Sequence, residues 1–454
     1  MSRKTKITMA VGVALAIMAV LVAYFVWFKR STYVSSLPAD AQAVARLDMH
    51  ALKEAGITLP AGSTLEQMEH SGIDFAQPLY AFIDAGNSLG ALLPLQDATK
   101  WEAYLASQNI KVQKQRGYHW AQNGQWLMAY TDDRCLLAGP LSEQEMGRMR
   151  TRMVTLMEQK GKPDNALYRQ ANDSQAPLSA ACSTALAHHL FTNFAPEQSA
   201  LWTGSDEGIV SMQVNIQDKN ILAHVTLHGT GVEQDSTMLI PLEASQVPTL
   251  AAGQLASVSL GMNGEGLLKK LRKNPAVRTG LIALNFCIDL DMMIRSVHGA
   301  LTLSIPDDDY VRPNALLTAQ VRDTRFMQDS DGWAQGLSEE FGVKLTHLAD
   351  SAFALHWQYF DVCFGVRGHR LMAGTDSQTF VQALEQGSPT QSVGDKLPVG
   401  SLIYMQINLP AMMKNMSILT LLTGKGEALT SLLSQYDVLT VSVKAEGEAQ
   451  KEAR

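Results

Sequence analysis

The chain of 454 residues lacks most features that mark a redox protein, a zinc protein or a nucleic-acid-binding protein. Its cysteines are few and far apart, and no two of them form a CxxC pair. They are Cys135, Cys182, Cys287 and Cys363. Free thiols are therefore favoured over two disulfides. The net charge is −7, so no broad basic surface is expected, which argues against DNA or RNA as a partner.

Motifs of catalysis and cofactor binding are also missing. There is no HExxH, no Walker phosphate loop and no GxSxG elbow. The glycines of "GMNGEG", residues 261–266, lack GxGxxG spacing and fit a strand-to-helix turn. His224 and His228 stand in a strand pattern, where four residues span about 13 Å, too far to share a metal ion. We therefore predict no metal, no cofactor and no motif-borne catalytic residue.

One long uncharged run is present, at the N-terminus. Residues 7–28 contain no charged side chain, and as a helix they would span about 33 Å, enough to cross a bilayer. Basic residues in the tail 1–6 favour a cytoplasmic N-terminus, with the bulk of the chain across the membrane. A cleaved signal peptide would have a shorter apolar region and a small-x-small site close behind it. The sequence thus predicts an uncleaved single-pass anchor.

Several stretches of the sequence occur twice and in the same order. "GALLPLQDATKWEAYL" (90–105) resembles "NALLTAQVRDTRFMQD" (314–329). "TDDRCLLAGPLSEQEMGRM" (131–149) resembles "VRGHRLMAGTDSQTFVQAL" (366–384), and Gly139 aligns with Gly374 without a gap. A repeat of this length predicts two similar units.

The predicted boundaries follow from the repeat. Unit A covers residues 37–230, a linker covers 231–246, unit B covers 247–446, and a polar tail covers 447–454. Segment 37–57 of unit A corresponds to 247–271 of unit B, and 206–218 corresponds to 436–447.

Each unit alternates period-2 runs with short helical patterns. The stretch "IVSMQVNIQDKNILAHVTLHG" (209–229) predicts a hairpin that turns at "QDKN". Consecutive hairpins predict a mainly antiparallel sheet with helices packed on one face, which is an α+β fold. The other face of such a sheet can stay open.

Local patterns predict where two helices begin and what one helix buries. Asp97 and Asp323 recur at the start of a helical pattern and are expected as helix N-caps. Ser142 and Glu145 have the spacing of a capping box. A methionine stripe at helical spacing follows and is expected in the core; it consists of Met146, Met149, Met153 and Met157.

The anchor, the opening "LPADAQAVARLD", "ALLPLQDATKWEAYL" and "WLMAYTDDRCLLAG" resemble a family of uncharacterised envelope proteins common in Bacteroidota. Members of that family carry a membrane or lipid anchor and have no assigned activity. The resemblance therefore implies an envelope location but no catalytic residue. This chain has no cysteine just after the anchor to accept a lipid. We expect it in the bacterial inner membrane, with its bulk in the periplasm.

Three functions are consistent with these patterns. The first is a non-enzymatic, membrane-anchored envelope protein whose duplicated units bind a protein or surface partner. The second is an envelope enzyme of the hydrolase type whose site forms only in three dimensions; its candidate residues are His119, His356, Asp361 and His369. The third is a binder of lipid or another small apolar ligand. A flat apolar groove would favour a binder, whereas a deep polar pocket with shifted pKa values would favour an enzyme.

Overall fold

The computed structural model describes residues 33–55, 68–194, 207–229, 238–285, 288–306, 314–328, 332–333, 336–337, 342–357, 360–386, 391–414 and 433–446. The predicted anchor 7–28, Cys287 and the tail 447–454 lie outside these residues. The chain forms two compact units, Met1–Leu186 and Ala187–Arg454. None of the helices in the described part of the chain has both the length and the hydrophobicity that a membrane span needs.

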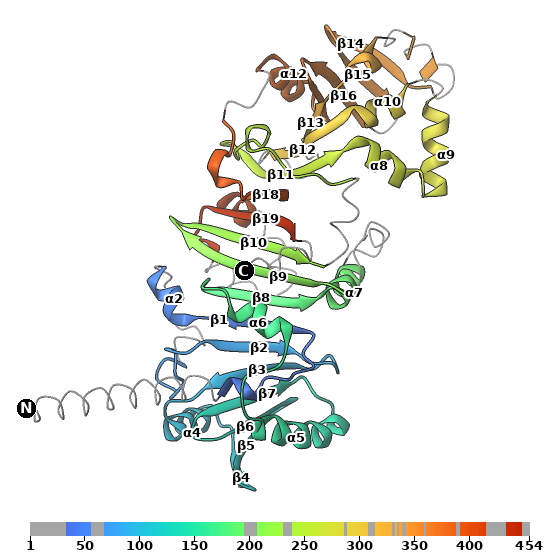
Figure 1. The fold of residues 1–454 in the computed structure, drawn as a ribbon. Helices are drawn as coiled ribbons and strands as arrows, with labels where there is room; N and C mark the ends of the chain where they lie inside the picture. The colour runs from blue at the N-terminus through green and yellow to red at the C-terminus, as the bar shows by residue number, and fades with distance from the viewer. Residues whose placement is uncertain are drawn as a thin grey trace, which may run out of the picture. The chain divides into compact units, whose positions relative to one another are not determined.

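The first unit is built on a sheet of eight described strands (Figure 1). Their order across the sheet is β8–β1–β2–β3–β7–β6–β5–β4, and each neighbouring pair is antiparallel. The strands are β1 Ala43–Leu47, β2 Leu79–Ile83, β3 Leu89–Pro94, β4 Val112–Gln115, β5 Tyr118–Asn123, β6 Trp126–Tyr130, β7 Arg134–Gly139 and β8 Leu178–Ser183.

Short helices connect these strands. They are η1 Tyr33–Ser36, α2 Met49–Glu54, α4 Ala98–Ser107, α5 Glu143–Glu158 and α6 Ala166–Asn172. The predicted cap at Asp97 is confirmed, because its carboxylate accepts the N–H groups of Thr99 and Lys100. At the start of α5, the Glu145 carboxylate accepts the N–H and O–H of Ser142.

Helices cover both faces of the first sheet. Trp101 and Leu105 of α4 pack with Cys135 of β7. Met149 and Met153 of α5 lie with Leu136, the next residue of the same strand. Successive strand residues point to opposite faces, so α4 and α5 lie on opposite sides. The prediction that helices cover one face only is therefore wrong for this unit, since Cys135 and Leu136 are both buried.

The methionine stripe is part of the core, as predicted. Met149, Met153 and Met157 of α5 are buried against the sheet, and Met146 at the start of the stripe is half-buried.

The second unit is built on a sheet of eleven described strands. Their order is β9–β10–β19–β18–β11–β12–β13–β17–β16–β15–β14, and only β10 and β19 pair in parallel within this described set. The strands are β9 Ile209–Gln217, β10 Asn220–His228, β11 Gln254–Asn263, β12 Val297–Pro306, β13 Leu316–Val321, β14 Lys344–Ala349, β15 Ala352–Trp357, β16 Phe360–Arg367, β17 Arg370–Gly374, β18 Ser401–Asn408 and β19 Val438–Glu446.

Helices in this part of the chain are again short. They are α7 Thr184–Phe194, which begins at the end of the first unit, η3 Ala244–Gln246, α8 Gly264–Leu271, α9 Pro275–Leu284, α10 Leu290–Ser296, η4 Arg325–Met327, α12 Ser377–Gln386 and η5 Gly394–Lys396. Asp323 precedes η4, and its carboxylate accepts the N–H of Arg325.

The predicted hairpin is confirmed. β9 and β10 pair antiparallel around Asp218 and Lys219, whose φ angles are 47° and 62°. Two consecutive positive φ values are typical of a type I′ turn, which matches the twist of the two strands. The chain as a whole has the predicted α+β class with a mostly antiparallel sheet.

The two sheets share one strand order. Eight strands of the second unit correspond, in chain order, to the eight strands of the first. Their order across the sheet is β18–β11–β12–β13–β17–β16–β15–β14, which matches β8–β1–β2–β3–β7–β6–β5–β4 in the first unit. The second unit adds β19, β10 and β9 beside β18.

Candidate functional site

The structure brings together only two of the residues proposed for an enzyme. His356 and Asp361 face each other on β15 and β16, with 3.0 Å between Nδ1 and Oδ1. The other ring nitrogen of His356 lies 3.0 Å from the hydroxyl of Thr346. The side chains of His356 and Asp361 are 42% and 61% exposed, so the pair lies on the surface rather than in a pocket.

The remaining two candidates lie elsewhere. His119 is on β5 of the first unit, where its ring stacks on Tyr130 at 4.8 Å and its Nδ1 lies 3.8 Å from Glu102. His369 is in the turn before β17, and its carbonyl accepts the N–H of Val321. His119 thus belongs to a different unit from the His356–Asp361 pair, and within the described part of the second unit His369 makes no contact with that pair.

A polar cluster that the sequence did not reveal lies on β9, β10 and β19. The Oγ of Ser211 is 2.8 Å from Nε2 of His228, and Nδ1 of His228 is 3.5 Å from Oε2 of Glu446. This is the order of groups in a serine–histidine–carboxylate triad. The signal was hidden because it depends on the parallel pairing of β10 with β19, strands more than 200 residues apart in the chain.

The same strands hold a second histidine. Nδ1 of His224 is 2.7 Å from the hydroxyl of Ser442. Burial lowers the pKa of His224, and the charge of Lys444 lowers it further. The neutral imidazole is therefore favoured at this position.

Burial limits the chemistry of this cluster. Ser211 is 7% exposed and lies within a strand rather than on a turn that would present it to a substrate. The thiols are similarly withdrawn: Cys135 and Cys363 are buried, Cys182 is half-buried, and all three are free. Burial raises the pKa of the Cys135 thiol, which disfavours the nucleophilic thiolate.

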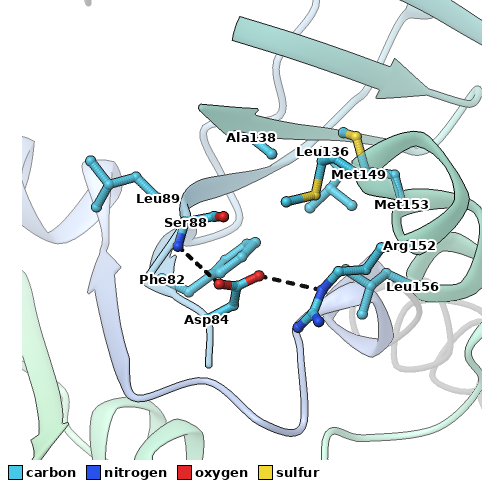
Figure 2. A pocket seen from close by; sticks show the side chains of 10 residues that line it. All are labelled: Phe82, Asp84, Ser88, Leu89, Leu136, Ala138, Met149, Arg152, Met153 and Leu156. Carbon is cyan, nitrogen blue, oxygen red and sulfur yellow. Dashed lines mark hydrogen bonds and ion pairs between the residues drawn. The ribbon is translucent and has the colours of Figure 1, made fainter. Parts of the chain in front are cut away.

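The pocket between α5 and the first sheet is too small for a ligand. Figure 2 shows Phe82, Leu136 and Met153 around it, with Asp84 and Arg152 at one side. Its free space of about 10 Å³ is barely enough for one water. Asp84 accepts the N–H groups of Gly86 and Ser88, and its Oδ2 lies 3.3 Å from Nε of Arg152. These contacts hold the β2–β3 turn against α5.

A continuous row of apolar side chains crosses the first sheet on the face that α4 covers in part, since Leu137 and Met128 of this row pack against the core under that helix. Residues that are directly opposite on neighbouring strands share a face, so the strand register defines a row. The first apolar row consists of Ala180, Ala45, Ala81, Ala91, Leu137, Met128, Ala121 and Val112. Beside it, on the same face, Leu89 is 45% exposed and Trp126 is 42% exposed, with the Trp126 ring against Gly139.

The second sheet repeats this arrangement at larger scale. The second apolar row consists of Val214, Ala223, Val441, Met405, Val258, Leu303, Leu317, Ala373, Phe364 and Phe353. Leu303 and Leu317 are opposite each other and both 36% exposed. At the β15–β16 end, Trp333 stacks on Phe364 and closes the row.

The opposite face of the second sheet is polar but buried. Ser259 is 1% exposed, Thr302 is 2% exposed, and their hydroxyls are 2.8 Å apart. Segments that include Leu242, Val247 and Leu397 pack over this face. Around Leu303 and Leu317 the usual arrangement, with apolar side chains inside and hydroxyls outside, is therefore reversed, although the same apolar face is buried farther along at Met262 and Ala319.

The exposed part of each apolar face is the candidate functional surface, at Leu303 and Leu317 in the second row and at Leu89 and Trp126 beside the first. Alternation along each strand was visible in the sequence, but which part of each face the helices and loops would leave open was not. The side chains of the rows contain no hydrogen-bonding group apart from weakly polar sulfur, so they can hold an apolar surface but perform no acid–base chemistry. A break of this kind in the ordinary pattern is expected at a functional site.

Comparison with known proteins adds a distant structural likeness. No family model matches the chain, and no curated protein matches it. Crystal forms I, III and IV of TP0453 are similar, with 7%, 8% and 7% identity and TM-scores of 0.26, 0.27 and 0.28 for forms I, III and IV respectively. These matches cover 78%, 78% and 79% of this chain and 96%, 96% and 98% of TP0453. At these values the likeness supports no conclusion about function.

Proposed function

We propose that this chain is a non-enzymatic, membrane-anchored envelope protein that binds a protein partner on the apolar rows of its two sheets. The observation that supports the proposal is the reversed second sheet, in which Ser259 and Thr302 are buried while Leu303 and Leu317 stay open. We also infer that residues 7–28 anchor the chain in the bacterial inner membrane with the bulk in the periplasm, and that the chain resembles the Bacteroidota envelope family.

The shared strand order supports a duplicated unit as the basis of this surface. Each unit offers an apolar row, so one partner with two apolar patches, or two copies of one partner, could engage both units. Binding through two linked sites raises the effective affinity when the geometry allows both to be occupied.

The physical gain comes from burial of the open side chains. Removing apolar surface from water contributes about 25 cal/mol per Å², and extended apolar patches on a protein mark interaction sites. The partner must present an apolar patch too, because a polar group placed against these rows would lose its hydrogen bonds to water at a cost of about 1–3 kcal/mol.

Site-specific photo-crosslinking in native membranes tests the proposal. A photoreactive amino acid replaces Leu89 in one full-length variant and Leu303 in another, and Val399 provides the control because it is 97% exposed and outside both rows. We expect the same partner to crosslink at positions 89 and 303 and not at 399. Crosslinks at all three positions, or at none, would contradict the proposal.

A pair of charge substitutions tests whether the partner binds the face of the second sheet that carries the apolar row. Leu303→Asp places a carboxylate on the second apolar row and should abolish crosslinking from a probe at Leu317. Gln213→Asp is the matched control, since Gln213 is exposed on the opposite face of the same sheet. Equal loss in both variants would mean that charge, rather than the apolar face, governs binding.

Hydrolysis is the second candidate function, favoured by the contacts of His228 with Ser211 and Glu446. In this reading His228 would take the proton of the Ser211 hydroxyl as the oxygen attacks an ester carbonyl, and would pass it to the alcohol that leaves when the ester C–O bond breaks. A fluorophosphonate probe should then label the full-length protein but not its Ser211→Ala variant. Failure to label the native protein would exclude this function.

A further inference from the structure

Helix α9 of the second unit is apolar and yet exposed. Seven of its ten residues, Pro275–Leu284, are apolar. Val277 is nevertheless 38% exposed and Ile282 is 54% exposed. Figure 1 shows α9 beyond α8, at the margin of the second unit and away from its sheet. A helix that is apolar around most of its circumference is ordinarily buried in a core or in a membrane.

The helix is well defined by its own sequence. The side chain of Asn274 accepts the N–H groups of Ala276 and Val277, and Pro275 occupies the first helical position, where no N–H is needed. The exposed helix therefore does not depend on a core contact to begin at this residue.

Basic residues gather around this helix. The stretch 264–285 carries five Lys or Arg side chains and one acid, Glu265, in a chain whose net charge is −7. Arg272 pairs with Asp291. In the described part of the chain, Lys269, Lys273 and Arg278 are exposed and enter no ion pair.

We propose that α8 and α9 dock on an anionic phospholipid surface. The apolar side chains of α9 enter the boundary between headgroups and acyl chains, while Lys269, Lys273 and Arg278 contact lipid phosphates. The combination of an apolar helix with adjacent cations fits a bilayer surface of opposite charge. Each Lys or Arg near such a surface favours binding by roughly fivefold.

This contact is separate from the partner on the apolar rows and from the predicted anchor. The anchor would fix the chain to the membrane, whereas α9 would bring a defined part of the second unit onto the lipid. The two proposals can therefore fail independently.

The test follows α9 in the full-length protein reconstituted into bilayers. Ile282→Cys carries a polarity-sensitive fluorophore, and the bilayers are either phosphatidylcholine alone or a mixture of phosphatidylcholine and phosphatidylglycerol. We expect a blue shift of the emission in the anionic bilayer only, and loss of that shift in high salt. The native chain treated with the same reagent provides the blank for labelling of its own cysteines.

Two variants sharpen the result. Val399→Cys is the matched control, because Val399 is an exposed apolar residue outside the α8–α9 region, and its label should not respond to lipid. Reversal of three charges, Lys269→Glu with Lys273→Glu and Arg278→Glu, should lower the ratio of docked to undocked protein by at least about a hundredfold. Circular dichroism confirms that these surface variants fold.

Several outcomes would overturn the proposal. An equal shift in both bilayers would show that anionic lipid is not recognised, and no shift in either would show that α9 stays in water. A shift without lipid that grows with protein concentration would show that a second copy of the chain covers α9. A shift that survives charge reversal would remove the role assigned to the cations.

Discussion

The two units share a strand order but differ in what they bury on one face of the sheet. In the first unit Val44 and Phe82 are opposite each other on β1 and β2, and both are buried. The corresponding pair on β11 and β12 of the second unit is Ser259 and Thr302, which are also buried. The same position is therefore filled by hydrocarbon in one unit and by hydrogen-bonded hydroxyls in the other.

This difference distinguishes the face of each sheet that stabilises the fold from the face that is a candidate for binding. The buried face tolerates either chemistry as long as volume is filled and hydroxyls are paired. The other face is apolar in both units and is covered only in part, by α4 in the first unit and around the buried Met262 and Ala319 in the second. Apolar side chains that stay exposed beyond those contacts are the better candidate for a binding surface, and this is why the apolar rows support the proposed function more strongly than any buried cluster does.

The largest expected effect comes from the part of the core that the two units have in common. Leu136 lies under α5 and Met372 under α12, and each is 1% exposed. Leu136→Ala and Met372→Ala should each lower the unfolding free energy of their own unit by about 2–5 kcal/mol, because each leaves a cavity. Hydrogen exchange read by mass spectrometry resolves the two units.

The control for this comparison is Val399→Ala, which removes methyl groups from a side chain already 97% exposed. It should leave exchange in both units unchanged. A Leu136→Ala variant that accelerates exchange equally in β2 and β12 would show that the units unfold as one body, and the comparison between them would then lose its basis.

A smaller effect is expected from the buried hydroxyl pair. Ser259→Ala or Thr302→Val alone leaves one hydroxyl without a partner and should cost about 1–3 kcal/mol. The double variant removes both hydroxyls and should cost less than the sum of the two single changes. The same hydrogen-exchange measurement on β11 and β12 gives these values.

The first unit provides the reverse experiment. Val44→Ser introduces a hydroxyl among the apolar residues that correspond to this pair, and it should destabilise the first unit by more than Ser259→Ala destabilises the second. If the double variant cost as much as the two single changes added together, the two hydroxyls would not act as a pair, and the polar face would need another explanation.

Local features were predictable from the sequence because they depend on neighbouring residues. The cap at Asp97 and the turn at Asp218 follow from side-chain chemistry and backbone preference. Gly139 and Gly374 mark the limit of this approach. Gly374 shares its face with Met372 under α12, whereas Gly139 lies on the face away from α5.

Their gapless alignment is thus displaced by one residue in space. A shift of one residue moves a side chain to the other face of a sheet, so the resemblance of two strands does not fix which side chains are buried. The candidate surface was missed for the same reason. Its rows depend on the register of distant strands, including the parallel pair β10 and β19, and no local pattern encodes that register.

The smallest expected effect concerns pH and the polar side of the second unit. The pKa of His224 is lowered, first by burial and then by Lys444. The unfolded state therefore binds a proton more readily than the folded state. The stability associated with neutral His224 is fully present above the unfolded pKa near 6.5 and is lost as the pH falls through the lowered folded pKa.

Hydrogen exchange of β10 between pH 7.5 and 5, corrected for the intrinsic exchange rate, should show this loss, and His224→Gln should reduce the slope. It should not remove the slope, because burial and Arg322 also lower the pKa of His298 in the same unit. A slope that is unchanged in His224→Gln would assign the whole effect to other groups. A reduced slope would show that the polar face of the second sheet makes its stability depend on pH, which is a property that a purely apolar core cannot provide.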